Sequence, residues 1–523
     1  TAYYRQRMVN AQRFMTMDYA YTEDSKLTEL LERMQTQARG NGLGMLRIYM
    51  ASVSLVEALF GMGFSLFLLL NYFAMSGGLA VSQFWIIALC VMFALGLLAN
   101  FIMLSVSAKK VSQIFIDNEK CNASAGYYLT YIKADEAAKD ARLYNQKNMI
   151  VKIFEESFPL RTWLNFFTFE GHTQAILSAL LAFVGGAFFI LSGVGALGGA
   201  PVGGIVQSVG AVTTLASAFA AVVNVAGTLY MNAPFLKPLR DFMQMPDLLV
   251  KGDKPIPFIL NKAAGKNCIV NADDIEIEFA NVSFKYPASE TYALRNLNLK
   301  LHSGKRLAVV GLNGSGKTTM IKLLCRLYDP TEGEIRLNGV NIKELSKEEY
   351  TKLFTVVFQD FKLFPLWLGQ NVSVSGEPDA ARVAECLDKA GFSERLQKLP
   401  HGIDTILFTQ YDEDGVQVSG GEAQKIALAR ALYKTAPIVV LDEPTAALDP
   451  IAEAEVYSTF DRTIEGRTCV FVSHRLSSCK FCDDIAVFDG GTLTQRGDHE
   501  TLLSDTTGRY HELWNAQASH YTE

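Results

Sequence analysis

The sequence is most informative where charged side chains are absent. From Gln174 to Tyr230 it contains no Asp, Glu, Lys or Arg, although charged residues make up 20 % of the whole chain. From Asp273 onward the composition is that of an ordinary soluble domain. Because 523 residues are also too many for one ordinary domain, this split predicts a membrane domain followed by a soluble domain.

The chain also lacks a basic excess and a cysteine framework. Its formal net charge of −6 offers no positive surface for nucleic acid, so we expect no nucleic-acid partner. The eight cysteines are scattered, and the pair Cys479–Cys482 has no second pair of ligands at zinc spacing. We therefore expect free thiols, with Cys479 and Cys482 packing the protein interior.

The first half of the chain contains long hydrophobic segments. Four segments reach the length of about 20 residues that a helix needs to cross a bilayer. The alternative, that they are buried core helices of a soluble protein, is disfavoured because four segments share this length and composition. Glu57 is the only charged residue inside them, and it either faces a substrate or makes a helix contact nearer the cytoplasm. The segments are Tyr49–Leu70, Phe84–Ser105, Gln174–Gly195 and Gly204–Tyr230.

Basic residues indicate the orientation of these segments. Lys and Arg are concentrated before the first segment and in the long connection between the second and third, whereas the two other connections are short and uncharged. By the positive-inside rule, the N-terminus, the long connection and the C-terminal half face the cytoplasm.

The second half of the chain contains a predicted phosphate-binding loop. Gly311-Leu-Asn-Gly-Ser-Gly-Lys-Thr318 follows a short apolar strand, Arg306–Val310, and precedes a helix expected at Thr319–Leu327. A strand, a Gly-x4-Gly-Lys-Thr loop and a helix are the context that a P-loop requires. Its backbone N–H groups wrap phosphates at a helix N-terminus, with Lys317 as a point charge and Thr318 as a hydroxyl for Mg²⁺.

Two further apolar strands end in polar residues. Ile438–Leu441 reads as a strand buried on both faces and is followed by Asp442 and Glu443. At this end of an open α/β sheet, Asp442 is placed to bind Mg²⁺ and Glu443 to act as a general base for water. Cys469–Ser473 is a similar strand, and His474 follows it in the matching position.

In this order the motifs resemble those of an ABC-transporter nucleotide-binding domain. Tyr286 matches the residue that stacks on adenine, Gln359 the Q-loop glutamine, and His474 the switch histidine. The resemblance implies ATP and Mg²⁺ as ligands, catalysis through Glu443, His474 and Gln359, and metal contacts from Thr318, Gln359 and Asp442. The remaining nucleotide contacts would come from the glycine loop and helix start: Gly311, Asn313, Gly314, Ser315, Gly316, Lys317, Thr318 and Thr319.

A second glycine-rich segment implies a partner subunit. Ser419, Gly420, Gly421 and Glu422 match the family signature, which commonly ends in Gln, and they precede a predicted helix. In the family this segment faces the P-loop of a second nucleotide-binding domain. The chain carries one such domain, so the resemblance implies a dimer of half-transporters, either identical or different.

The first half resembles the membrane domain of an exporter-type half-transporter. Asp18–Asp24 and Asp140–Gln146 then correspond to the intracellular loops that dock on nucleotide-binding domains. Such half-transporters have six spans, and we expect that the first two are absent from this sequence rather than from the protein, with a true four-span variant as the alternative.

The sequence thus predicts an all-α transmembrane domain at 1–250, a linker at 251–272 and an α/β P-loop NTPase at 273–523. We expect an ATP hydrolase in a bacterial cytoplasmic membrane that exports or flips a peptide, drug-like or lipid substrate. The alternatives are an importer that uses the exporter fold and a regulatory or sensory module that couples ATP to signalling.

Overall fold

The structure is a computed structural model that describes residues 2–40, 44–75, 135–157, 202–256, 275–409, 412–443, 466–473 and 476–519, with scattered helical residues between 91 and 190. The chain forms two compact units. The first comprises residues 1–17 and 24–246, and the second comprises residues 18–23 and 247–523.

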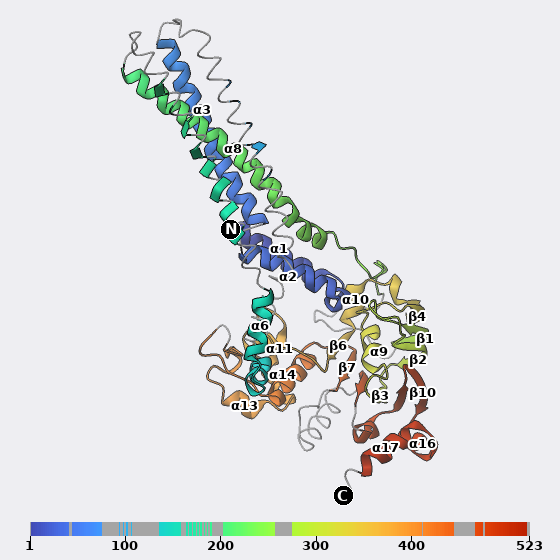
Figure 1. Ribbon diagram of the computed structural model, residues 1–523. Helices are drawn as coiled ribbons and strands as arrows, with labels where there is room; N and C mark the ends of the chain where they lie inside the picture. Colours follow the sequence, from blue (N-terminus) through green and yellow to red (C-terminus); the bar gives the residue numbers. More distant parts are fainter. Residues whose placement is uncertain are drawn as a thin grey trace. The chain divides into compact units, whose positions relative to one another are not determined.

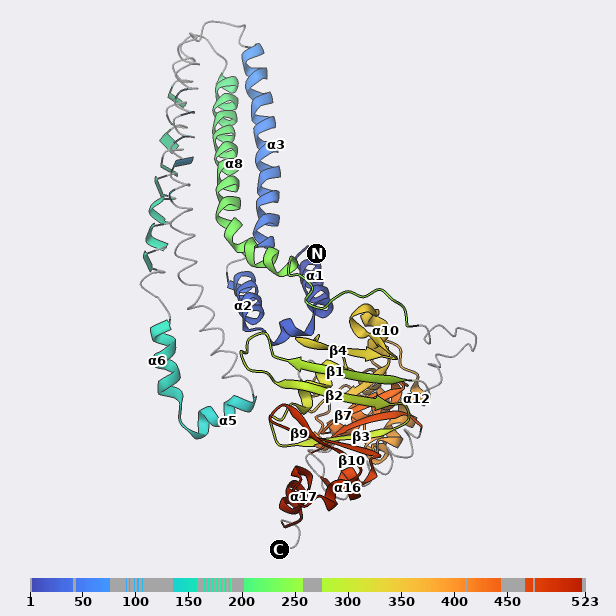
Figure 2. The same cartoon turned by 90° about the vertical axis from the view of Figure 1, so that its right-hand side faces the viewer.

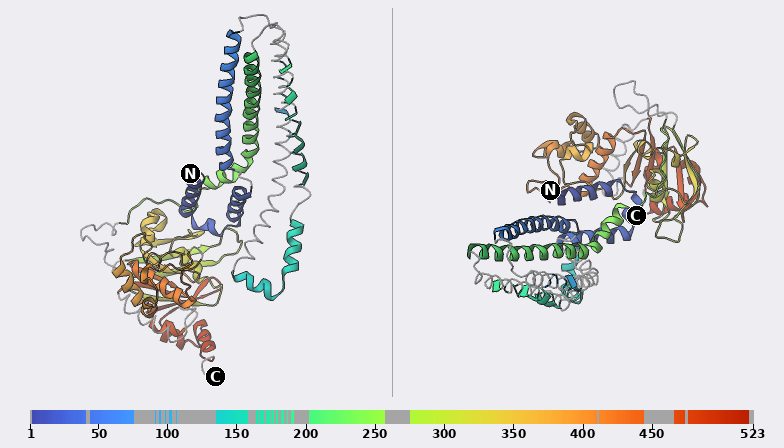
Figure 3. Two further views of the ribbon diagram at one scale, coloured as in Figure 1. Left: turned by 90° about the vertical axis from the view of Figure 1, so that its left-hand side faces the viewer. Right: turned by 90° about the horizontal axis from the view of Figure 1, so that it is seen from above.

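The described part of the first unit is entirely helical. Its longest helices, α3 and α8, run antiparallel and side by side (Figures 1 and 3). The expected loop at Asp140–Gln146 forms the end of α5 and a turn before α6, where Asn145 adopts a φ of 48°. The helices are α1 (Ala2–Thr16), α2 (Ser25–Gly40), α3 (Met45–Met75), α5 (Asp135–Leu143), α6 (Lys147–Ser157) and α8 (Val202–Met243).

Small side chains let α3 and α8 approach each other. Ala51, Ala58 and Ser65 recur on one face of α3 and are buried, while a Cβ placed on Gly61 would lie 3.5 Å from the Cβ of Ala218 on α8. Close backbone approach through small residues is the usual way in which membrane helices pack, because lipid offers no hydrophobic drive for their association.

Two of the described helices are long and apolar enough to cross a membrane, Met45–Asn71 and Val209–Met243. The first contains the expected segment Tyr49–Leu70. The second begins five residues after the expected start at Gly204 and continues through Pro234 and Pro238. The other two expected spans, 84–105 and 174–195, fall largely outside the described residues.

The second unit contains two sheets, which form adjacent layers in Figure 2. The smaller sheet is antiparallel with the order β2-β1-β4-β5, and the larger has the order β10-β9-β3-β8-β7-β6 with all pairings parallel except that of β9 with β10. The strands are β1 (Glu276–Phe284), β2 (Leu294–His302), β3 (Arg306–Gly311), β4 (Glu332–Leu337), β5 (Val340–Asn341), β6 (Phe354–Val357), β7 (Ile438–Asp442), β8 (Thr468–Val472), β9 (Asp484–Asp489) and β10 (Thr492–Gly497).

Helices cover the larger sheet, and one hydrophobic core fills the space between the two sheets. The parallel strands are buried on both faces, as their uninterrupted apolar sequences predict; all five residues of β7 are buried. The helices are α9 (Lys317–Leu324), α10 (Lys347–Lys352), α11 (Leu368–Ser373), α12 (Ala380–Lys389), α13 (Ser393–Gln397), α14 (Gly420–Tyr433), α16 (His499–Ser504) and α17 (Arg509–Ser519), with 3-10 turns that include η1 (Tyr19–Glu23) and η7 (Leu476–Phe481).

The helix expected at Thr319–Leu327 has different limits in the structure. It begins at Lys317 and ends at Leu324. Arg326 adopts a φ of 53°, which stops the helix, and its fully buried guanidinium donates hydrogen bonds to the backbone oxygens of Leu345, Val250 and Lys343. These tertiary hydrogen bonds override the local preference for helix.

Candidate active site

The loop between β3 and α9 depends on glycine at two positions. Gly311 has a φ of 151°, and a Cβ there would lie 2.2 Å from the carbonyl oxygen of Phe488. Gly316 has a φ of 103°, and a Cβ there would lie 2.6 Å from the side chain of Leu294. Side chains are therefore excluded both by backbone conformation and by space, which explains why the loop carries glycine at its two ends.

Lys317 already makes hydrogen bonds inside this loop. Its side chain is 5 % exposed, and its Nζ donates to the carbonyl oxygens of Gly311 and Leu312, at 2.9 Å each. Burial lowers the pKa of Lys317, while the nearby carboxylates of Glu443 and Asp442 act in the opposite direction. The ammonium is thus held beside the loop whose N–H groups would receive phosphates.

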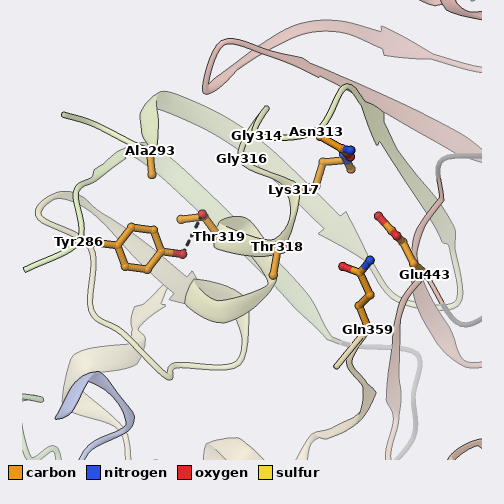
Figure 4. A pocket seen from close by; sticks show the side chains of 10 residues that line it. All are labelled: Tyr286, Ala293, Asn313, Gly314, Gly316, Lys317, Thr318, Thr319, Gln359 and Glu443. Carbon is orange, nitrogen blue, oxygen red and sulfur yellow. Dashed lines mark hydrogen bonds between the residues drawn. The ribbon is translucent and has the colours of Figure 1, made fainter. Parts of the chain in front are cut away.

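A cavity of 480 Å³ opens over the loop. Figure 4 shows Tyr286 and Ala293 at one end of this cavity, Gln359 and Glu443 at the other, and the glycine loop and the start of α9 between them. The structure therefore brings together residues from five separate parts of the chain. The lining residues are Tyr286, Ala293, Asn313, Gly314, Gly316, Lys317, Thr318, Thr319, Gln359 and Glu443.

Tyr286 is held by polar and aromatic contacts. Its hydroxyl lies 3.0 Å from Oγ1 of Thr319, and either group can donate the hydrogen bond. The ring packs edge-on against Phe284 and Tyr328, with centroid separations of 5.0 and 5.5 Å. The ring orientation is therefore set by neighbours before any ligand enters the cavity.

Asp442, at the end of β7, is 1 % exposed. Burial raises its pKa to about 6, the charge of Glu443 adds to the rise, and the Thr318 hydroxyl and Lys317 oppose it. Neither carboxylate oxygen has a well-formed hydrogen bond within the described residues. A buried carboxylate that lacks strong donors, next to the Thr318 hydroxyl, has the oxygen chemistry that suits a Mg²⁺ ion.

Glu443 stands directly after this strand in an unusual backbone conformation. Its φ is 51°, a region that non-glycine residues seldom occupy, and its N–H donates to the carbonyl oxygen of Val472 at 3.0 Å. Its carboxylate faces the cavity in Figure 4. Strained backbone of this kind is common at sites of function because the surrounding fold must enforce it.

The segment at Ser419–Glu422 forms a different structure. Ser419 caps α14: the Glu422 N–H donates to its Oγ at 3.2 Å, and the Ser419 N–H donates to Oε2 of Glu422 at 2.8 Å. Arg395 lies 2.8 Å from the other carboxylate oxygen of Glu422. Gly420 and Gly421 occupy the first turn of the helix, and none of these four residues lines the cavity.

Other expected site residues lie beside the cavity or outside the described part. Gly311 and Ser315 shape the loop without lining the cavity, and His474 is not among the described residues. Sequence reasoning missed Ala293, which lies at the Tyr286 end. The expected docking of Asp18–Asp24 did not identify its side-chain partners Lys322 and Lys347, because those contacts join positions far apart in the chain.

The C-terminal half matches a known family. Residues 294–446 match the model described as ABC transporter. The chain is 41 % identical over 243 residues, 46 % of its length and 40 % of the relative's, to an ATP-dependent lipid A-core flippase of Alkalilimnicola ehrlichii. The residues matched to the family model contain the P-loop together with Gln359 and Glu443 of the cavity, so the domain binds ATP.

Two relatives match a larger part of the chain. It is 32 % identical over 387 residues, 72 % of its length and 60 % of the relative's, to the subtilin transport ATP-binding protein SpaT of Bacillus subtilis. It is also 32 % identical over 407 residues, 77 % of its length and 52 % of the relative's, to the mitochondrial iron-sulfur clusters transporter ABCB7 of Oryzias latipes. The chain thus spans less than two thirds of the length of these curated relatives.

The fold has a solved counterpart. The structure of a bacterial Atm1-family ABC exporter with ATP bound superposes with a TM-score of 0.78 at 22 % identity, covering 99 % of this chain and 86 % of the other. The expected combination of a helical transmembrane domain with an α/β P-loop domain is confirmed by this match.

Proposed function

Because the chain belongs to the ABC transporter family and has the fold of its exporters, we propose that it is a subunit of an ATP-driven membrane transporter that exports or flips its substrate. The observation that carries the proposal is the cavity that joins Tyr286, the P-loop lysine and Glu443 in a chain that also has membrane-length helices. Binding and hydrolysis of ATP would supply the driving force.

The cavity is large and polar enough to suggest a pose for ATP. The adenine would stack on Tyr286, the triphosphate would lie over the glycine loop, and the terminal phosphate would reach Lys317. Glu443 would take a proton from the attacking water. Its fixed backbone keeps the carboxylate directed into the cavity.

Thr318, Gln359 and Asp442 are the residues that we propose hold Mg²⁺. When bound, the ion would neutralise charge on the phosphate oxygens. Asp442 suits this role because its buried carboxylate has no strong donor of its own. We propose that His474, which follows β8, completes the catalytic residues.

A second copy of the nucleotide-binding domain would complete the site. Ser419–Glu422 begins a helix yet stands apart from the cavity, which supports a role opposite the P-loop of another subunit. We therefore propose a dimer of half-transporters in a membrane, with the nucleotide-binding domains in the cytoplasm. The bacterial relatives support a bacterial cytoplasmic membrane.

The relatives are named for lipid A-core, subtilin and iron-sulfur clusters, so the substrate class needs a direct assay. The protein would be placed in sealed vesicles with ATP outside, and movement of labelled lipid, peptide and drug-like solutes would be followed. ATP-dependent accumulation supports export or flipping. Movement in the opposite direction would identify an importer, and ATP hydrolysis without movement would favour a signalling module.

The Glu443→Gln variant tests the catalytic assignment. We expect ATP binding to persist while hydrolysis and transport fall by at least about 100-fold, the usual size of a general-base contribution. Glu413→Gln, at an exposed carboxylate before the signature, is the matched control and should behave as wild type. Near-normal hydrolysis by Glu443→Gln would show that another group activates the water.

A further inference from the structure

The carboxylate of Glu23 gathers several donors in the second unit. Its Oε1 accepts from Nζ of Lys322 at 2.5 Å and from the hydroxyl of Tyr19 at 3.1 Å. Its Oε2 accepts from the hydroxyl of Tyr328. Burial acts to raise the pKa of Glu23, yet these donors outweigh burial and lower it. Glu23 is therefore an ionised anchor that fixes the short turn η1.

Lys322 connects this anchor to the cavity. It lies on α9, the helix that begins with Lys317 of the P-loop. Its Nζ is 5.4 Å from the ring centre of Tyr286 and 5.6 Å from that of Tyr19, which is within the range of cation–π attraction. Its side chain is only 17 % exposed, so water screens these contacts weakly.

The other end of the same segment is anchored away from the cavity. Asp18 Oδ2 accepts from the backbone N–H groups of Leu248 and Leu249, at 2.7 and 3.0 Å. Its Oδ1 accepts from Nζ of Lys347 at 2.9 Å. None of these residues lines the cavity. Residues 18–23 thus have two ionic anchors, and only the one at Lys322 touches a cavity residue.

We propose that Lys322 is a positioning residue that couples the stacking of a nucleobase on Tyr286 to the seating of residues 18–23. One ammonium serves both the Tyr286 ring and the Glu23 carboxylate. A base that stacks on the ring changes the surroundings of the ammonium and hence its hold on Glu23. By linkage, a seated Glu23 favours base binding to the same extent. The coupling responds to the base and is independent of the phosphates, which in the proposed pose would lie over the glycine loop.

This inference rests on the proposed nucleotide site, so its test separates base from phosphate. The full-length protein in lipid nanodiscs would be titrated with MgATP and with magnesium tripolyphosphate, which has no base. Lys322→Met should weaken ATP binding and raise the KM for ATP about threefold, the size of a partly exposed cation–π contact. It should leave tripolyphosphate binding and kcat unchanged, and Lys322→Arg should restore the wild-type KM.

Hydrogen exchange measures the seating of residues 18–23 directly. Hydrogen exchange in residues 18–23 should slow with ATP but not with tripolyphosphate, and Lys322→Met should abolish that difference. Lys347→Met removes the ionic anchor at Asp18 and should leave both the KM and the ATP response intact.

The two hypotheses fail in different ways. An unchanged KM and exchange response in Lys322→Met, or an equal loss of ATP and tripolyphosphate affinity, would overturn the inference about Lys322. Absence of ATP binding by the wild-type protein would instead overturn the proposed function.

Discussion

At the scale of single residues, two buried aspartates show how surroundings decide the state of a carboxylate. Asp18 accepts two backbone N–H groups and the ammonium of Lys347, and these outweigh its burial and lower its pKa. Asp442 is also buried but lacks such donors, so its pKa rises to about 6. Asp18 is therefore suited to anchoring structure, whereas Asp442 is suited to receiving a cation.

Asp18→Asn should destabilise the second unit by about 1–3 kcal/mol at pH 7, because the N–H groups of Leu248 and Leu249 and the Lys347 ammonium lose a charged acceptor. The pKa of Asp18 is below its ordinary value of 3.8, so its contribution is present above pH 3.8 and disappears as the pH falls through the native-state pKa. Thermal unfolding of wild type and variant between pH 3 and 7 would measure the difference. Asp253→Asn, at an exposed position, is the control, and a pH-independent gap would contradict the argument.

At the scale of elements, a side chain of α8 ties down the start of α3. Asn232 is 1 % exposed, its Nδ2 donates to the carbonyl oxygen of Gly44 at 2.9 Å, and its Oδ1 accepts from the Gly44 N–H at 2.7 Å. Gly44 has a φ of 76° and directly precedes α3. The pair of hydrogen bonds thus satisfies the backbone where α3 begins.

Asn232→Leu should lower the stability of the first unit by about 1–3 kcal/mol, because two half-buried backbone groups of Gly44 lose their partner. Asn224→Leu, at an exposed position of the same helix, should have little effect. Thermal unfolding of the two variants in detergent would be monitored by the accessibility of cysteines introduced near residue 44. Equal behaviour of the two variants would show that Asn232 does not hold α3.

At the scale of the whole molecule, structure formed by neighbouring residues could be predicted from the sequence, whereas contacts between distant residues could not. The P-loop was predictable because its strand, glycines and helix are contiguous, and each imposes a conformation on the next. The bond between Lys322 and Glu23 joins positions 299 residues apart, and no periodicity marks either residue. Likewise, the end of α9 at Leu324 depends on distant carbonyl groups that accept from Arg326.

If each ATP site is formed by two subunits, dimers that combine two different inactive variants should regain activity. Ser419→Arg places a large cation at the start of α14 and should abolish hydrolysis, as we expect for Glu443→Gln. In a mixed dimer, one site would combine the intact Glu443 of one subunit with the intact Ser419 of the other. If the two chains pair at random, ATPase activity should recover to roughly a quarter of wild type. No recovery on co-expression of the two variants, with mixed dimers verified by two different tags, would contradict shared sites.

The two hydrogen bonds from Lys317 to the P-loop carbonyls bear on nucleotide entry. Through these bonds the ammonium supports the loop backbone, so the loop is preorganised for phosphates. Only the hydrogen-bond partners of this one side chain need to change when phosphates bind. We therefore expect nucleotide entry to require little rearrangement of the loop backbone.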